Sequence, residues 1–255
     1  MHFFVMKSKT LKLLFIFILV MVTLSVDVKG TTGAQVFFGK VDRKVPIYSV
    51  ERADKNIAIS FDAAWGADKT EKIMEILKEH NCKATFFLVG FWVDKYPELV
   101  KKIDENGFEI GTHSNTHPDM AKLDITNMRL ELETSIAKIK NITKKEVNLF
   151  RAPFGSYNNN LISTAEELGL YTIQWDVDSL DWKGISASQI SSNIITKVGS
   201  GSIILCHNNS DNIIEALPGV LSSLKQRGYN FVSIGDLIYK NEYRIDSTGK
   251  QIKNI

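Results

Sequence analysis

Five polar residues capable of acid–base chemistry each fall at or just after the end of an apolar run. They are Asp62, His113, Arg151, Asp181 and His207. Short apolar runs bounded by turn signals are typical of buried strands. In folds built from parallel strands, the chemistry lies beyond the carboxyl ends of the strands. We therefore expect these side chains, which follow five different strands, to meet at one site.

Four of these residues can be grouped into an acid and a base. An ionised Asp62 can take a proton from water, and Arg151 would help to orient its carboxylate. Asp181 can fix the tautomer of His207 and raise the pKa of its imidazole, so that the ring protonates a leaving amine. From the residue alone, Asp62 is equally consistent with a salt-bridge partner or a turn residue.

Two histidines have the spacing of metal ligands. His113 and His117 are four residues apart, which suits Zn²⁺ or a similar cation at the end of a strand or on one face of a helix. The alternative is a pair of ordinary histidines in a polar loop. Three of the five histidines in the chain lie at predicted strand ends, and this concentration favours a site.

Strand-like and helix-like segments alternate along most of the chain, which is typical of an α/β fold with a parallel sheet wrapped by helices. We predict seven strands, at residues 57–62, 83–90, 108–114, 148–154, 171–177, 202–207 and 231–236. The helices between them are amphipathic, and Asp68 with Glu71 has the spacing of a capping box. The FDAAWG segment lacks the G-x-G-x-x-G spacing, so a dinucleotide site is not expected.

The 255-residue chain is nearly neutral, with 31 Lys and Arg against 29 Asp and Glu, and we expect no nucleic-acid partner. An apolar run after several lysines makes residues 1–30 an export signal or a single uncleaved membrane anchor, and we expect a protein outside the cytoplasmic membrane. Residues 31–55 are predicted as a linker and leading segment, 56–240 as one domain, and 241–255 as a polar tail. We expect a monomer.

Five segments of the chain, in order, carry a resemblance to a known family. The segments SFDAAWG, THSNTH, RAPFGSY, DSLDW and ILCH resemble the five motifs of the NodB-homology polysaccharide deacetylases, carbohydrate esterase family 4. The resemblance covers residues 56–240 and implies a distorted (β/α) barrel of about seven parallel strands. The FDAAWG variant is similar to the PdaB-type sporulation polysaccharide deacetylase-like proteins. It implies a hydrolase of N-acetyl groups on peptidoglycan amino sugars, acting in spore-wall formation.

The resemblance assigns roles to particular residues. It implies that Asp62 is the catalytic base paired with Arg151, and that Asp181 and His207 form the acid pair. The resemblance also implies that His113 and His117 are ligands of Zn²⁺ or another divalent cation.

Three further positions match family residues that contact the acetyl group. The backbone amide of Phe154 becomes a donor to the oxyanion, although the family more often has Tyr there. Trp182 and Leu205 become the apolar pocket for the acetyl methyl group. Without the motif context, plain core packing explains Trp182 and Leu205 equally well.

One position departs from the family pattern. Active members generally carry a second aspartate, a metal ligand, where this chain has Ala63. A catalytic zinc normally has three protein ligands plus water, and here two histidines remain. Three hypotheses follow: a peptidoglycan deacetylase, a catalytically impaired glycan-binding protein, and a deacetylase of another polymer such as chitin or xylan.

Overall fold

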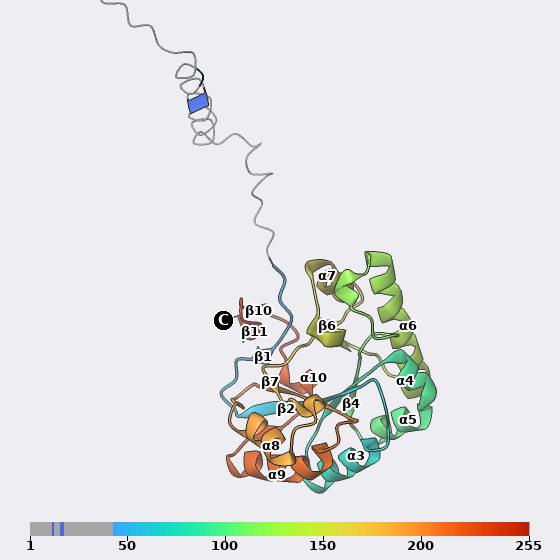
Figure 1. Ribbon diagram of the computed structural model, residues 1–255, viewed down its shortest axis with the longest axis vertical. Helices are drawn as coiled ribbons and strands as arrows, with labels where there is room; N and C mark the ends of the chain where they lie inside the picture. The colour runs from blue at the N-terminus through green and yellow to red at the C-terminus, as the bar shows by residue number, and fades with distance from the viewer. Residues whose placement is uncertain (1–11, 13–15, 18–42, 255) are drawn as a thin grey trace, which may run out of the picture. The chain divides into compact units, whose positions relative to one another are not determined.

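The computed structural model describes residues 12, 16–17 and 43–254 (Figure 1). The chain divides into two units, Met1–Arg43 and Lys44–Ile255. Within the first unit, residues 12, 16 and 17 are helical, and most of the predicted export segment at 1–30 lies outside the described residues. Of the helices that the structure describes, none has the length and apolar character needed to cross a membrane.

The second unit is built on a curled half-barrel of seven parallel strands, which confirms the predicted fold class. The strands run in the order β6-β5-β4-β3-β2-β8-β7, and a short β9 pairs with the start of β2. Their bounds are β2 Asn56–Ala63, β3 Thr85–Leu88, β4 Glu109–Thr112, β5 Leu149–Phe150, β6 Tyr171–Thr172, β7 Val177–Asp178, β8 Ile203–His207 and β9 Asn230–Phe231.

Helices cover the outside of this sheet (Figure 1). They are α3 Thr70–Glu79, α4 Gly90–Lys95, α5 Pro97–Glu105, α6 Ile125–Thr143, α7 Asn159–Glu167, α8 Ala187–Ile195, α9 Ile213–Gln226 and α10 Ile234–Leu237, with 3₁₀ turns η2 Met120–Lys122, η3 Pro153–Gly155 and η4 Asp181–Lys183. The predicted capping box is wrong, because Lys69 rather than Asp68 is the N-cap of α3 and its side chain makes no capping hydrogen bond.

Strand β2 shows how the sequence positions the site. Ile59, Phe61 and Ala63 belong to the main core beneath the helices, whereas Ala58 packs in the second core among strand residues inside the barrel. Successive side chains of a strand point to opposite faces. The alternation therefore turns Asp62 toward the barrel interior, at the carboxyl end of the strand.

The predicted strand at 171–177 is wrong as a single element. Residues 171–172 form β6 and 177–178 form β7, at opposite ends of the sheet order. A polar side chain between these two strands explains the break. The side chain of Asp176 accepts hydrogen bonds from Ser202 Oγ at 2.8 Å and from the Ile203 amide at 2.8 Å. These bonds hold the chain at the start of β8 rather than beside β5.

The predicted strand at 231–236 is likewise shorter than expected. Only its first residue pairs, within β9, and the chain then turns into α10. The Ser233 side chain accepts from the Asp236 amide at 3.1 Å and so caps the new helix.

The packed unit extends on both sides of residues 56–240. Strands β1 Ser49–Val50, β10 Tyr243–Ile245 and β11 Lys250–Lys253 form a separate three-stranded sheet, in which β1 pairs with β11. The segment leading into β1 also forms bridges from Ile47 to Ile173 and from Ser49 to Ser202. Residues 241–254, predicted as a polar tail, therefore supply a hairpin, and the leading segment spans between the two edges of the half-barrel.

Candidate active site

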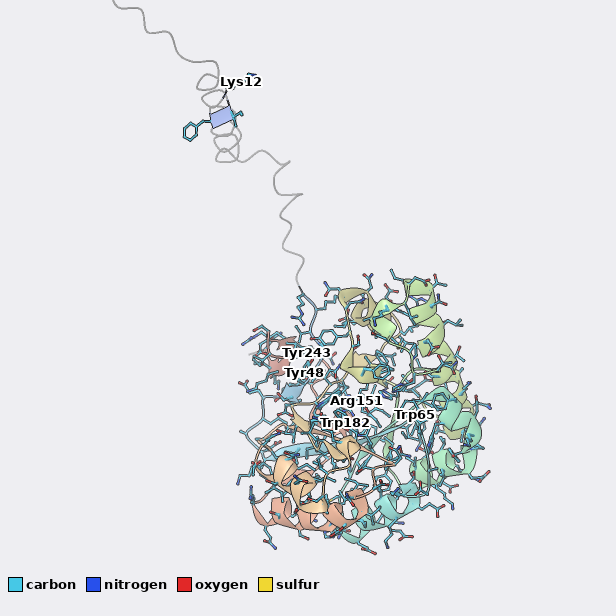
Figure 2. The ribbon with its side chains drawn as sticks, in the orientation of Figure 1. Lys12, Tyr48, Trp65, Arg151, Trp182 and Tyr243 are labelled. Atoms are coloured by element: carbon cyan, nitrogen blue, oxygen red, sulfur yellow. The ribbon has the colours of Figure 1, made fainter. Side chains whose placement is uncertain are left out.

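A cavity of about 550 Å³ lies at the carboxyl ends of the parallel strands. It brings together eight of the nine side chains predicted for the site: Asp62, His113, His117, Phe154, Asp181, Trp182, Leu205 and His207. The ninth, Arg151, is fully buried and reaches the cavity through its ion pair with Asp62. Figure 2 shows Arg151 in the interior of the fold, with Trp65 and Trp182 near it in this view.

Asp62 and Arg151 form a buried ion pair. Nη1 of Arg151 lies 2.7 Å from Oδ1 of Asp62, and Nη2 donates to the Gln174 carbonyl at 3.2 Å. The guanidinium also lies 4.2 Å from the centre of the Phe87 ring. Burial raises the pKa of Asp62, but the positive charge of Arg151 is the largest of the effects that lower it, and the pKa falls below its usual value. Asp62 is therefore ionised at neutral pH.

His207 and Asp181 form the second pair. Nδ1 of His207 lies 2.7 Å from Oδ1 of Asp181, and the His207 amide donates to Oδ2 at 2.8 Å. An ionised carboxylate only accepts, so Nδ1 carries a proton in this bond. Burial lowers the pKa of His207, but the hydrogen bond and the charge of Asp181 outweigh it and raise the pKa above its usual value. This imidazole is suited to donate a proton from Nε2.

His113 and His117 face each other with ring centres 5.0 Å apart. Nδ1 of His113 lies 2.8 Å from the Arg151 carbonyl, which only accepts, so the neutral ring keeps its lone pair on Nε2. Nε2 in turn lies 3.6 Å from Oδ2 of Asp62. Burial lowers the pKa of both rings, and His113 adds to the effect on His117, whose pKa falls to about 4. Both imidazoles are neutral at pH 7, as metal ligands must be.

The donor set of this cavity does not fit a catalytic zinc with three protein ligands. Within the part of the chain that the structure describes, no three His, Cys, Asp or Glu side chains are grouped to hold a metal ion. Ala63 is fully buried in the main core and offers no donor. Oδ1 of Asp62 is held by Arg151. The predicted pair of histidines is thus present, but a third protein ligand is missing.

The residues predicted for the acetyl group lie on three separate elements. Leu205 is a buried residue of β8, whereas Trp182 in η4 and Phe154 in η3 are exposed at the cavity. Phe154 has a φ of 59°, and Leu180, which precedes η4, has a φ of 57°. Such backbone conformations are strained for residues other than glycine and cluster at functional sites.

Sequence reasoning missed several residues of the cavity, among them Trp65, Trp175, Asp178 and Asn209. Trp65 had a usable signal, because a large aromatic residue two positions after a strand end and three after Asp62 is out of place in a solvent-exposed loop. Nothing in the sequence indicated that Trp175 would line the cavity, because its position depends on the break between β6 and β7.

Two acid–base pairs at the carboxyl ends of a curled parallel sheet define a hydrolase-like site on a deacetylase-type barrel. The family model for polysaccharide deacetylases matches residues 49–173. A peptidoglycan-N-acetylglucosamine deacetylase of Bacillus cereus is 31% identical over 216 residues, which are 83% of this chain and 78% of that protein. The chain therefore belongs to the polysaccharide deacetylase family, carbohydrate esterase family 4, as its motifs indicate.

Two further comparisons concern proteins without an assigned activity or with an altered one. The uncharacterized protein YlxY of Bacillus subtilis is 34% identical over 76% of this chain, and the chain spans 60% of its length. Among solved structures, a mutant of a CE4 family pseudoenzyme from Bacillus anthracis, with restored enzymatic activity, is 35% identical. Its TM-score is 0.74, over 76% of this chain and 71% of that chain.

Proposed function

We propose that this protein is a hydrolase that removes N-acetyl groups from the amino sugars of peptidoglycan. The proposal rests on two groups that line one cavity and whose pKa values are shifted in opposite directions. Asp62 is held ionised by Arg151, and His207 has a raised pKa beside Asp181. Amide hydrolysis needs a base for the attacking water and an acid for the leaving amine.

The reaction can be written with this chain's own residues. Asp62 takes a proton from water, and the resulting hydroxide attacks the acetamide carbonyl carbon. The Phe154 amide donates to the oxygen that becomes negative, while Trp182 and Leu205 contact the methyl group. His207 then gives its proton to the nitrogen as the carbon–nitrogen bond breaks, leaving acetate and a free amine. No step is assigned to a metal ion, because the donor set lacks a third ligand.

The polymer is proposed by analogy with the Bacillus cereus relative, whose name gives peptidoglycan N-acetylglucosamine as its substrate. Chitin offers the same acetamido sugar, and xylan carries acetyl esters instead. The motifs do not distinguish between these polymers as substrates, so the experiment below tests each of them.

A second function is favoured by one observation. Ala63 is buried where active relatives carry a metal-binding aspartate, and the chain resembles a CE4 pseudoenzyme. A protein with this site can bind N-acetylated glycans without turning them over. The binder and the hydrolase make opposite predictions for acetate release.

The test is an acetate-release assay on peptidoglycan, chitin oligomers and acetylated xylan, with and without added Zn²⁺ or Co²⁺. We expect release from peptidoglycan by the natural chain, and loss of at least 100-fold in Asp62→Asn, because the base is gone. Asp211→Asn, which changes an exposed carboxylate on the same cavity, is the matched control. Release by Ala63→Asp alone, with glycan binding but no release by the natural chain, would overturn the hydrolase in favour of the binder.

Localisation and biological setting are part of the proposal. The apolar segment at 1–30 suggests an exported or membrane-anchored protein, and the similarity to PdaB-type proteins suggests a role in the spore wall. Fractionation of cells that produce the full chain, with and without residues 1–30, tests the first point. Timed detection through sporulation tests the second.

A further inference from the structure

The exposed aromatic side chains that the structure describes in Lys44–Ile255 gather at one place. In the part of Lys44–Ile255 that the structure describes, five large hydrophobic side chains are exposed: Trp65, Ile125, Leu130, Phe154 and Trp182. Three of them, all aromatic, line the cavity and are 57%, 70% and 58% exposed for Trp65, Phe154 and Trp182. Large exposed apolar surface that is concentrated in this way marks a binding site.

Trp65 is exposed on a rigid turn rather than on a loose loop. The carbonyl oxygen of the next residue, Gly66, accepts from Trp92 Nε1 at 2.7 Å and from Asn208 Nδ2 at 3.0 Å. Both donors come from buried residues. Gly66 has a φ of 67°, which glycine adopts without strain. The indole is thus held at the cavity by the packed interior below it.

Trp65 continues into a row of rings. The centre of the His117 ring lies 4.8 Å from Trp65 and 4.7 Å from Phe154, in edge-on contacts of 66° and 77°. Trp65 also meets Phe91 at 6.3 Å and 45°. None of these contacts is a flat stack of two rings. Trp182 differs, because Lys183 Nζ lies 5.0 Å from its ring centre.

We propose that Trp65, with the row it forms through His117 to Phe154, is a platform for a neighbouring sugar of an N-acetylated hexosamine chain. The proposal rests on the function proposed above, in which the acetamido group of one sugar enters the cavity. Trp65 and Asp62 are three residues apart, so the platform begins beside the reacting group. An aromatic face stacks on the C–H face of a pyranose ring, and such a ring has no charge to pair. Trp65 therefore acts as a positioning and specificity residue that favours polymers over short fragments.

The test uses the intact chain with N-acetylglucosamine and its oligomers of two to six units, and with peptide-free glycan strands of peptidoglycan as a second probe. Binding is measured by calorimetry, and KM and kcat are measured where acetate is released. We expect affinity of the natural chain to rise by about 10-fold between the monosaccharide and the dimer. Trp65→Ala loses this gain but binds the monosaccharide within 2-fold.

Two other variants make the result specific. Trp65→Phe keeps an aromatic face and should retain most of the gain, whereas Leu130→Ala removes an exposed apolar side chain on α6, away from the cavity, and should behave like the natural chain. The platform is overturned if Trp65→Ala binds the dimer and the glycan strands as well as the natural chain does, or if it weakens binding of the monosaccharide and the dimer equally. Absence of acetate release would contradict only the proposed hydrolase activity, because the binding measurements test the platform separately.

Discussion

The pKa values of Asp62 and His207 are shifted in opposite directions because their partners have opposite charges. Arg151 stabilises the ionised form of the first, and Asp181 stabilises the protonated form of the second. The two residues share a cavity. A proton transferred from His207 to Asp62 would nevertheless leave each charged partner beside a neutral group. At the scale of the residue, the acid and the base are thus set by the second residue of each pair.

The pH profile of acetate release should reflect this tuning. The rate needs Asp62 ionised and His207 protonated, so it should fall on the acid side only below about 3.9 and on the alkaline side only above about 6.5, the ordinary values for Asp and His. Asp181→Asn removes the charge that raises the pKa of His207, and the alkaline limb should move to lower pH. Asp211→Asn is the control and should leave that limb in place. An unmoved limb in Asp181→Asn would contradict the assignment of His207.

Arg151 should be required for stability as well as for the site. Arg151→Met leaves the buried carboxylate of Asp62 without its counter-charge, and we expect a loss of about 3 to 5 kcal/mol in the free energy of unfolding, measured in urea. The double variant Asp62→Asn with Arg151→Met should recover a large part of this loss, because no charge is then left buried. Lys72→Met breaks the exposed pair with Glu75 and should leave the midpoint unchanged. Equal stability of the two Arg151 variants would argue against a charged Asp62.

At the scale of the element, the turn after β2 holds Trp65 while the strand holds Asp62. Gly66 and Gly107 both have a positive φ, 67° and 76°, but only Gly66 is next to a residue that lines the cavity, Trp65. A Cβ at Gly66 would come 3.3 Å from Asn209 Cβ, whereas one at Gly107 meets nothing within 4 Å.

This pair offers a matched experiment. Gly66→Ala and Gly107→Ala should each lower stability by about 1 to 2 kcal/mol, because both place a Cβ in the left-handed region. Only Gly66→Ala should also weaken binding of the tetrameric oligosaccharide, since it shifts the turn that carries Trp65. Thermal melting and calorimetry measure the two effects separately. Equal loss of binding in both variants would mean that the turn has no special role.

The elements also show which sequence signals were sufficient. The helix α5 begins at Pro97 and ends before Gly107, as the positions of this proline and this glycine predict. The strand ends that carry Asp62, His113 and His207 were predicted from apolar runs alone, and the site followed from them. The break between β6 and β7 was missed, because Asp176 turns the chain through bonds to Ser202 and Ile203, which are distant in sequence. Local patterns do not contain that information.

At the scale of the whole molecule, residues 241–254 contribute to the packed unit. Gln251 is fully buried, and its side-chain amide both donates to the Tyr239 carbonyl and accepts from the Tyr239 amide, each at 2.8 Å. Composition predicted a polar tail here because the segment has few apolar residues. Its packing instead depends on hydrogen bonds to β1 and to Tyr239, which have no signature in the segment itself.

Truncation after Lys240 tests this difference. We expect a clear drop in the melting temperature, because β1 loses its partner strand and Tyr239 loses both bonds from Gln251. Gln251→Ala should reproduce part of the drop, since it leaves the Tyr239 backbone groups without these partners. A melting temperature unchanged by the truncation would contradict a role for this segment in stability.

The pairing of β1 with β11 has a consequence for the order of folding. Ser49 lies opposite Lys250, so this pairing joins residues that are distant in the sequence of the packed unit. Such contacts close a large loop and slow the completion of a fold. If the chain is exported as proposed, β1 gains its partner strand only after β11 has also crossed the membrane.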